Sequence, residues 1–259
     1  MKTPVGLALL LSFLAGAATM LGGALAFVIK KKNLAVLSVG LGFSAGVMLY
    51  VSFMELLPQA LSVLQRTCGA GGRGLGTCIF FAGIGVAWLA DVCLPSHHMQ
   101  ARRLRPADKL KQLGLFTALA STAHNFPEGL ATFAAALQEP VLGFSVALAV
   151  AAHNIPEGMA VALPVFHATN SRLKAFGYSA VSGLAEPVGA LVGFFIFRHS
   201  LQAALLGSMF AFVSGIMVYI SLDELLPTAH EYGEGHRVIG GVVGGMAVMA
   251  AVLHIFKVT

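Results

Sequence analysis

One six-residue pattern with the composition of a metal site occurs twice in this chain, each time inside a long apolar stretch. The copies are HNFPEG at 124–129 and HNIPEG at 153–158, and alanines flank both at equivalent positions. Imidazole nitrogens and carboxylate or amide oxygens are common ligands of divalent metals in proteins. Ionisable residues are costly inside a bilayer, and those found there usually mark ion pathways or paired sites. The repeat therefore predicts a metal site within the membrane.

Helical spacing places the ligand-type residues of each copy on one face. Residues i and i+4, or i and i+3, share a face of an α-helix. His124 therefore points the same way as Glu128, and Asn125 also reaches toward that glutamate. The second copy repeats this arrangement with His153, Asn154 and Glu157. Two helices that face each other would thus bring two imidazoles, two amides and two carboxylates together.

A third buried carboxylate is expected at the same depth in the membrane as the two hexapeptides. Glu186 lies mid-helix in SGLAEPVGA, and we expect it beside the asparagines. Because a carboxylate has two oxygens, Glu128 and Glu157 can each bridge, so the cluster predicts a two-metal centre. Imidazole with carboxylate suits zinc and iron, and the oxygens admit manganese. Binding needs neutral histidine and ionised glutamate, so the affinity for metal should fall as the pH drops.

The rest of the composition shows which elements must position these residues. The chain has 259 residues, 57% of them hydrophobic and 10% charged, with a mean hydropathy of +0.83. A soluble globular chain carries about 25% charged residues, so we expect an all-α integral membrane protein. Continuous apolar runs argue against a β-barrel, whose strands alternate. Eight transmembrane helices are predicted near 5–29, 34–57, 76–94, 113–137, 141–164, 176–197, 203–227 and 238–256.

The positive charges indicate orientation rather than a nucleic-acid partner. Of the 16 lysines and arginines, eleven fall in loops on one side of these helices and five on the other. Lysine and arginine concentrate on the cytoplasmic side, so both termini are expected outside a bacterial inner (plasma) membrane, with lipid as the surrounding partner. The eleven residues are Lys30, Lys31, Lys32, Arg102, Arg103, Arg105, Lys109, Lys111, Arg172, Lys174 and Arg237.

A second, longer repeat indicates internal symmetry. Residues 42–60 align without gaps on 211–229, and both segments end in ELLP-containing sequence. The two helices are five crossings apart and therefore run in opposite directions. Inverted repeats around a midplane site are typical of secondary transporters. We expect a single domain, 1–259, with a first repeat at 1–94, a central hairpin at 112–164 and a second repeat at 172–259.

Two other features bear on the class of protein. Residues 1–26 have signal-peptide features, but the apolar stretch has spanning length, whereas the apolar core of a signal peptide is about 7–15 residues, so we interpret it as the first helix. The three cysteines, Cys68, Cys78 and Cys93, form no CxxC pair, which favours neither a thiolate metal site nor a disulfide framework.

Polar residues away from the centre are candidates for the ends of a path. Glu55 is expected near the outer end, and Asp223 and Glu224 near the cytoplasmic end; helix capping is an equally good explanation of all three. Ser121 and Thr117 share the His124 face, although packing is the simpler role. His167 is a weaker candidate for the exit. The loop histidines His97, His98, His230 and His236 can collect metal or can be plain surface.

At these motifs the chain resembles the ZIP family of zinc/iron permeases, and within it the short bacterial branch. The resemblance covers essentially the whole chain and rests on HNFPEG, HNIPEG, SGLAEPVGA and DELLP. It implies eight helices, a binuclear site between the fourth, fifth and sixth, and uptake of divalent metal into the cytoplasm. It further implies a zinc-type site at His124, Glu128, His153 and Glu157. The iron-type site it implies consists of Asn125, Glu128, Asn154, Glu157 and Glu186, with the two glutamates bridging.

The resulting hypothesis is a transporter, not an enzyme, that takes up zinc, with iron, manganese and other divalent ions as further substrates and no cofactor. One alternative is an intramembrane metal-dependent hydrolase, but the HExxH motif is absent. Another is a proton-coupled metal exporter, which only the direction of flux separates from an importer. The sequence leaves the dominant metal, proton coupling, channel or carrier behaviour and oligomeric state open, a homodimer among the arrangements.

Overall fold

The computed structural model describes residues 5–28, 33–93, 106–197 and 203–256, and every regular element among these residues is a helix. The elements are α1 (Val5–Ala24), η1 (Leu25–Phe27), α2 (Leu34–Val51), η2 (Ser52–Leu56), α3 (Leu57–Cys68), η3 (Gly69–Gly71), α4 (Gly72–Cys93), α5 (Pro106–Gln138), α6 (Pro140–Thr169), α7 (Arg172–Phe197), α8 (Ala203–Tyr219), η4 (Ile220–Leu225), α9 (Leu226–Tyr232) and α10 (Gly235–Phe256). The all-α prediction is confirmed for this part of the chain.

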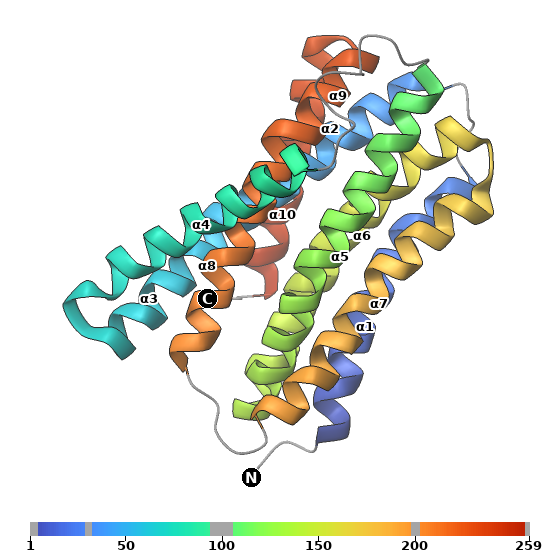
Figure 1. Ribbon diagram of the computed structural model, residues 1–259. Coiled ribbons are helices and arrows are strands. Elements are labelled where there is room, and N and C mark those ends of the chain that lie inside the picture. Colours follow the sequence, from blue (N-terminus) through green and yellow to red (C-terminus); the bar gives the residue numbers. More distant parts are fainter. Residues whose placement is uncertain (1–4, 29–32, 94–105, 198–202, 257–259) are drawn as a thin grey trace.

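The helices pack as two groups, which Figure 1 shows side by side. In one group α5 packs on α6 and α7, and α1 packs on α6 and α7. In the other, α2 packs on α10 and α9, and α8 packs on α3 and α4. The contacts of α2 with α6 and of α5 with α8 join the two groups. The twin hexapeptides lie on α5 and α6, so both copies belong to the first group.

Six segments of the described residues are long and apolar enough to cross a membrane. One of them, Leu34–Val92, is 59 residues long and contains the turn at η3 between α3 and α4. The helix α5 has 33 residues but is not among the six, and it carries Asp108, His124 and Glu128 along its length. The protein is therefore a multi-pass membrane protein, while the count of eight crossings remains a prediction.

The repeated sequence adopts the same local structure twice. A π-helical turn occupies Ser52–Leu56 after α2, and another occupies Ile220–Leu225 after α8. Each is followed by a helix with proline in its first turn, at Pro58 and Pro227. A π-helical turn inserts an extra residue and is frequent at functional sites. Glu55 and Glu224 lie at matching positions in the two turns.

The first predicted helix is confirmed as a member of the bundle over Val5–Ala24, where it packs against α6 and α7. Most of the basic residues that predict the orientation lie outside the described residues, including Lys30, Lys31, Lys32, Arg102, Arg103 and Arg105. We call the end of the bundle with the α5–α6 turn at Glu139 the outer end. The end with the α6–α7 turn at Asn170 is the inner end. Both names follow the orientation expected from the charges.

Candidate metal centre

The two hexapeptides meet across the antiparallel pair of α5 and α6. The Nε2 of His124 lies 2.5 Å from Oε1 of Glu157. The Nε2 of His153 lies 3.3 Å from Oε2 of Glu128. Each histidine thus contacts the glutamate of the opposite copy, which places all four side chains in one layer between the two helices.

The third helix of the centre is α7 (Arg172–Phe197), which supplies Glu186. Asn154 donates a hydrogen bond to Oε1 of Glu186 and a second one, of 2.9 Å, to the carbonyl of Ala15 on α1. Asn125 instead donates to the carbonyl and the hydroxyl of Ser182, both at 3.3 Å. The predicted position of Glu186 beside an asparagine is therefore confirmed for Asn154, whereas Asn125 pairs with Ser182.

All seven predicted ligands are buried, and none is more than 4% exposed. Each also keeps at least one buried side-chain nitrogen or oxygen without a hydrogen-bond partner among the described residues. These atoms are His124 Nδ1, Asn125 Oδ1, Glu128 Oε1, His153 Nδ1, Asn154 Oδ1, Glu157 Oε2 and Glu186 Oε2. Buried polar groups in native proteins are nearly always satisfied, so a cluster of such atoms has lone pairs available for a water or an ion.

Three carboxylates lie in this layer, and no lysine or arginine of the described residues forms an ion pair with them. Carboxylates that share a site without a cation repel one another. The two histidines lower this repulsion only when they are protonated. The donor set and its charge therefore fit divalent cations, which bring the missing positive charge and use the open lone pairs.

Hydroxyl groups and glycines hold the helices of the centre close together. Ser121 donates a hydrogen bond to Oε1 of Glu157, and its Oγ also lies against that of Ser182. The backbone approaches closely at Gly129 and Gly158, because a Cβ on either would overlap a backbone carbonyl, of Glu186 or Thr19 respectively. Small residues let transmembrane helices approach in this way.

Serines on three helices also donate to backbone carbonyls of the hexapeptides. Ser12 of α1 bonds to Gly129 at 3.2 Å, and Ser179 of α7 bonds to Gly158 at 2.9 Å. Ser44 of α2 bonds to Pro156 at 2.6 Å. The last of these bonds joins the two groups of helices. The ligand-bearing segments are therefore fixed from three sides.

Two neighbouring spaces lie between the outer end and the centre. A cavity of about 810 Å³ opens there, with Arg66 and Glu139 in its wall. A small space of about 20 Å³, enough for a single water, adjoins it and reaches Glu128 and His153. The two spaces share the side chains of Glu55, Gln59, Val146 and Phe210. Glu55, which accepts a hydrogen bond from Gln59, therefore lies between the outside and the centre.

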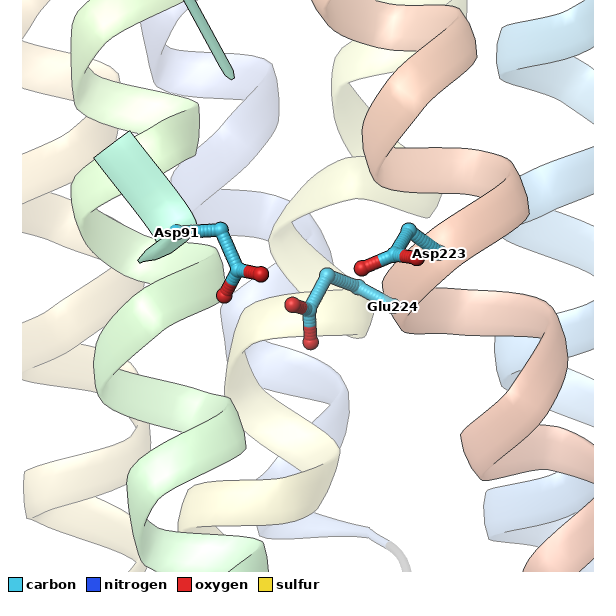
Figure 2. Close-up of side chains that lie close together, drawn as sticks. All are labelled: Asp91, Asp223 and Glu224. Carbon is cyan, nitrogen blue, oxygen red and sulfur yellow. The ribbon is translucent and has the colours of Figure 1, made fainter. Parts of the chain in front are cut away.

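An acidic cluster lies at the other end of the bundle, where α4 ends beside the second π-helical turn (Figure 2). It consists of Asp91, Asp223 and Glu224, whose ligand atoms all lie within 4.8 Å of one another. Tyr219 donates to Oδ2 of Asp91 at 3.3 Å and to Oδ2 of Asp223 at 3.0 Å. Among the described residues no other three histidine, cysteine or acidic side chains come this close, so the midplane ligands form pairs rather than a tighter group.

Sequence reasoning missed three residues of these sites. Asp91 is a carboxylate at the end of an apolar run, a signal of the kind that identified Glu186. Ser182 lies four residues before Glu186, on the same helix face. Gln59 stands four residues after Glu55 and reaches it for the same reason. Of the loop histidines, His97 and His98 lie outside the described residues, while His230 and His236 are exposed.

Comparison with known proteins agrees with the geometry. A model of the family described as ZIP Zinc transporter matches residues 95–253. A zinc transporter ZupT of Chlorobium phaeovibrioides is 54% identical over 253 residues, covering 94% of this chain and 95% of that protein. Proteins of the same name from Streptococcus mutans and Campylobacter jejuni are 47% and 46% identical, each covering 96% of this chain and 97% and 96% of their own lengths. The chain belongs to the ZIP zinc transporter family.

Proposed function

We propose that this protein takes up divalent metal ions, zinc first among them, through a binuclear site in the middle of the membrane. The observation that carries the proposal is the set of seven buried ligands, each with a polar atom that no described residue satisfies. The names of the relatives, zinc transporters similar along almost the whole chain, support the choice of metal.

In this proposal the two metal positions share their glutamates. The zinc-type position uses His124, Glu128, His153 and Glu157, whose side chains already meet as two histidine–glutamate pairs. The second position combines the two shared glutamates with oxygen ligands: Asn125, Asn154 and Glu186. Oxygen-rich coordination admits harder ions, so iron and manganese are the further substrates we propose. Thiolates are absent from both sets, which favours an ion that is released again.

The direction of transport is proposed from the two ends of the bundle. Glu55 lies between the outer cavity and the centre, where it meets an entering cation. Asp91, Asp223 and Glu224 lie at the inner end, where they attract an ion that leaves. With the inner end in the cytoplasm, this order of sites corresponds to uptake.

Two other functions use the same residues. A metal-dependent hydrolase would need a cleft that admits its substrate beside the metal, whereas the space that reaches Glu128 and His153 is only about 20 Å³, room for a single water. A proton-coupled exporter would have the same site and the opposite direction of flux. The similarity to named zinc transporters favours transport over hydrolysis. The flux experiment below distinguishes uptake from export.

The test is metal flux into proteoliposomes of known orientation. Zinc, iron(II), manganese(II) and cadmium are presented from the side of the outer end, with and without a pH gradient, and entry is followed with a dye trapped inside. We expect zinc to enter faster than into empty liposomes. Flux only in the opposite direction would make the protein an exporter, and absence of flux together with cleavage of a membrane peptide would make it a hydrolase.

A further inference from the structure

A buried histidine, His167, lies on α6 toward the inner end and is not one of the seven ligands. Its side chain is 6% exposed, and its Nδ1 lies 2.9 Å from the carbonyl oxygen of Leu163. A carbonyl only accepts, so Nδ1 carries the proton and Nε2 of the neutral ring keeps its lone pair. That Nε2 is buried without a hydrogen-bond partner among the described residues. A histidine oriented in this way by a backbone carbonyl has the arrangement found in metal ligands.

His167 lies on the same stripe of α6 as the midplane ligands. His153 and His167 are separated by 14 residues, close to four turns of 3.6 residues, and Glu157 and Pro164 fall between them on the same side. Glu157 and His167 are ten residues apart, or about 15 Å along the helix axis. His167 is thus too far from the centre to share its metal, but it lies directly beyond the centre on the way to the inner end.

Polar groups of α5 and α6 lie at levels between the midplane ligands and His167. Glu157 accepts from Ser121 of α5. One turn farther along that face, Thr117 is 3% exposed and its Oγ1 has no hydrogen-bond partner among the described residues. Gly114 of α5 packs against Val165 of α6. This contact continues the antiparallel register of the two hexapeptides, and in that register Thr117 is level with Pro164. Pro164 has no N–H, so the carbonyl of Ala160 loses its helical donor.

We propose that His167 is a metal ligand on the release side, which binds the ion briefly after it leaves the midplane centre. The ligand class is a borderline divalent cation such as zinc, for which a neutral imidazole is a good ligand. Ser121 and Thr117 line the intervening path with hydroxyl oxygens. The inference rests on the proposed transport function, because a release ligand has a role only if ions cross the protein.

The test compares two substitutions at this position. His167→Asn keeps a donor for the Leu163 carbonyl and removes the Nε2 lone pair, and His167→Cys restores a ligand that prefers cadmium. In proteoliposomes we expect His167→Asn to lower the maximal rate of zinc uptake about tenfold, the lower end of the cost of disturbing a metal site. Zinc affinity at the midplane, measured by titration of the purified protein, should stay unchanged. His167→Cys should raise cadmium uptake relative to zinc.

The matched control is His230→Asn. His230 makes the same Nδ1 contact of 2.9 Å, to Leu226, but its side chain is exposed. We expect wild-type uptake from this variant. Wild-type uptake by His167→Asn would overturn the inference, and so would equal losses for zinc and cadmium in both His167 variants, because a purely structural role predicts that result. Zinc uptake by the wild-type protein tests the proposed function separately, so the two failures are distinguishable.

Discussion

Replacing Glu157 by glutamine removes a charge from the centre and leaves its shape almost unchanged. Unit charges 4 Å apart interact by about 4 kcal/mol at an effective dielectric constant of about 20, so one carboxylate attracts a divalent cation by about 8 kcal/mol. Desolvation of the buried carboxylate offsets several kcal/mol of this attraction. A net loss of at least about 3 kcal/mol remains, which corresponds to an affinity roughly 100-fold lower. Both metal positions should weaken, because Glu157 is proposed to bridge them.

The fold should survive Glu157→Gln. The glutamine oxygen can still accept the hydrogen bond from Ser121, and the change removes one buried charge. The assay is the initial rate of zinc and iron(II) uptake into proteoliposomes across a range of metal concentrations, with thermal unfolding of the purified variant as the control. The two-site model would be refuted if a well-folded Glu157→Gln variant carried both metals within about twofold of the wild-type rate at low metal concentration. At such concentrations a roughly 100-fold loss of affinity must lower the rate of uptake.

Three further outcomes are expected. Glu186→Gln should impair iron(II) uptake more than zinc uptake, because Glu186 belongs only to the proposed oxygen-rich position; equal effects in a competition assay would contradict that assignment. Lowering the outer pH from about 7.5 to about 6 crosses the ordinary titration range of histidine. This change should raise the zinc concentration needed for half-maximal uptake, because protons compete for the ligand lone pairs. An unchanged zinc concentration for half-maximal uptake argues against histidine ligands. Gly158→Ala should lower stability by about 1–3 kcal/mol, because its Cβ meets the Thr19 carbonyl. Gly177→Ala has open space around it and replaces a glycine inside α7, so this control should unfold at the wild-type temperature or slightly above it. An unfolding temperature of Gly158→Ala equal to that of the wild type would show that α1 and α6 can separate there.

Much of the candidate site was predictable because it is local. Helical spacing alone put His124 and Glu128 on one face of one helix. Depth in the membrane followed from counting along apolar runs, which located Glu186 at the same level. The contacts between copies were not predictable in the same way. The His124–Glu157 pair depends on the rotation of α5 and α6 about their axes, which the packing of both against α1 and α7 decides.

Residues whose role depends on neighbours from distant parts of the chain were harder to find. Asp91 joins Asp223 and Glu224 only because α4 ends beside the second π-helical turn. Helical spacing does not predict the π-helical turn itself, and the turn rotates the side chains that follow it relative to a regular α-helix. Gln59 reaches Glu55 within one helix, but its place between two cavities depends on Val146 and Phe210 from other helices.

The sequence by itself determined that this protein lies in a membrane, that it is built of helices, and which side chains are candidate metal ligands. Long apolar runs indicate a bilayer, and histidine, asparagine and glutamate at helical spacing within them predict a partner such as a metal ion. The tertiary structure alone decided which lone pairs remain open. Whether Asn125 faces Glu186 or Ser182, and whether His167 keeps a free Nε2, depends on how helices far apart in the chain rotate and pack. Spacing within one helix carries no information about that rotation.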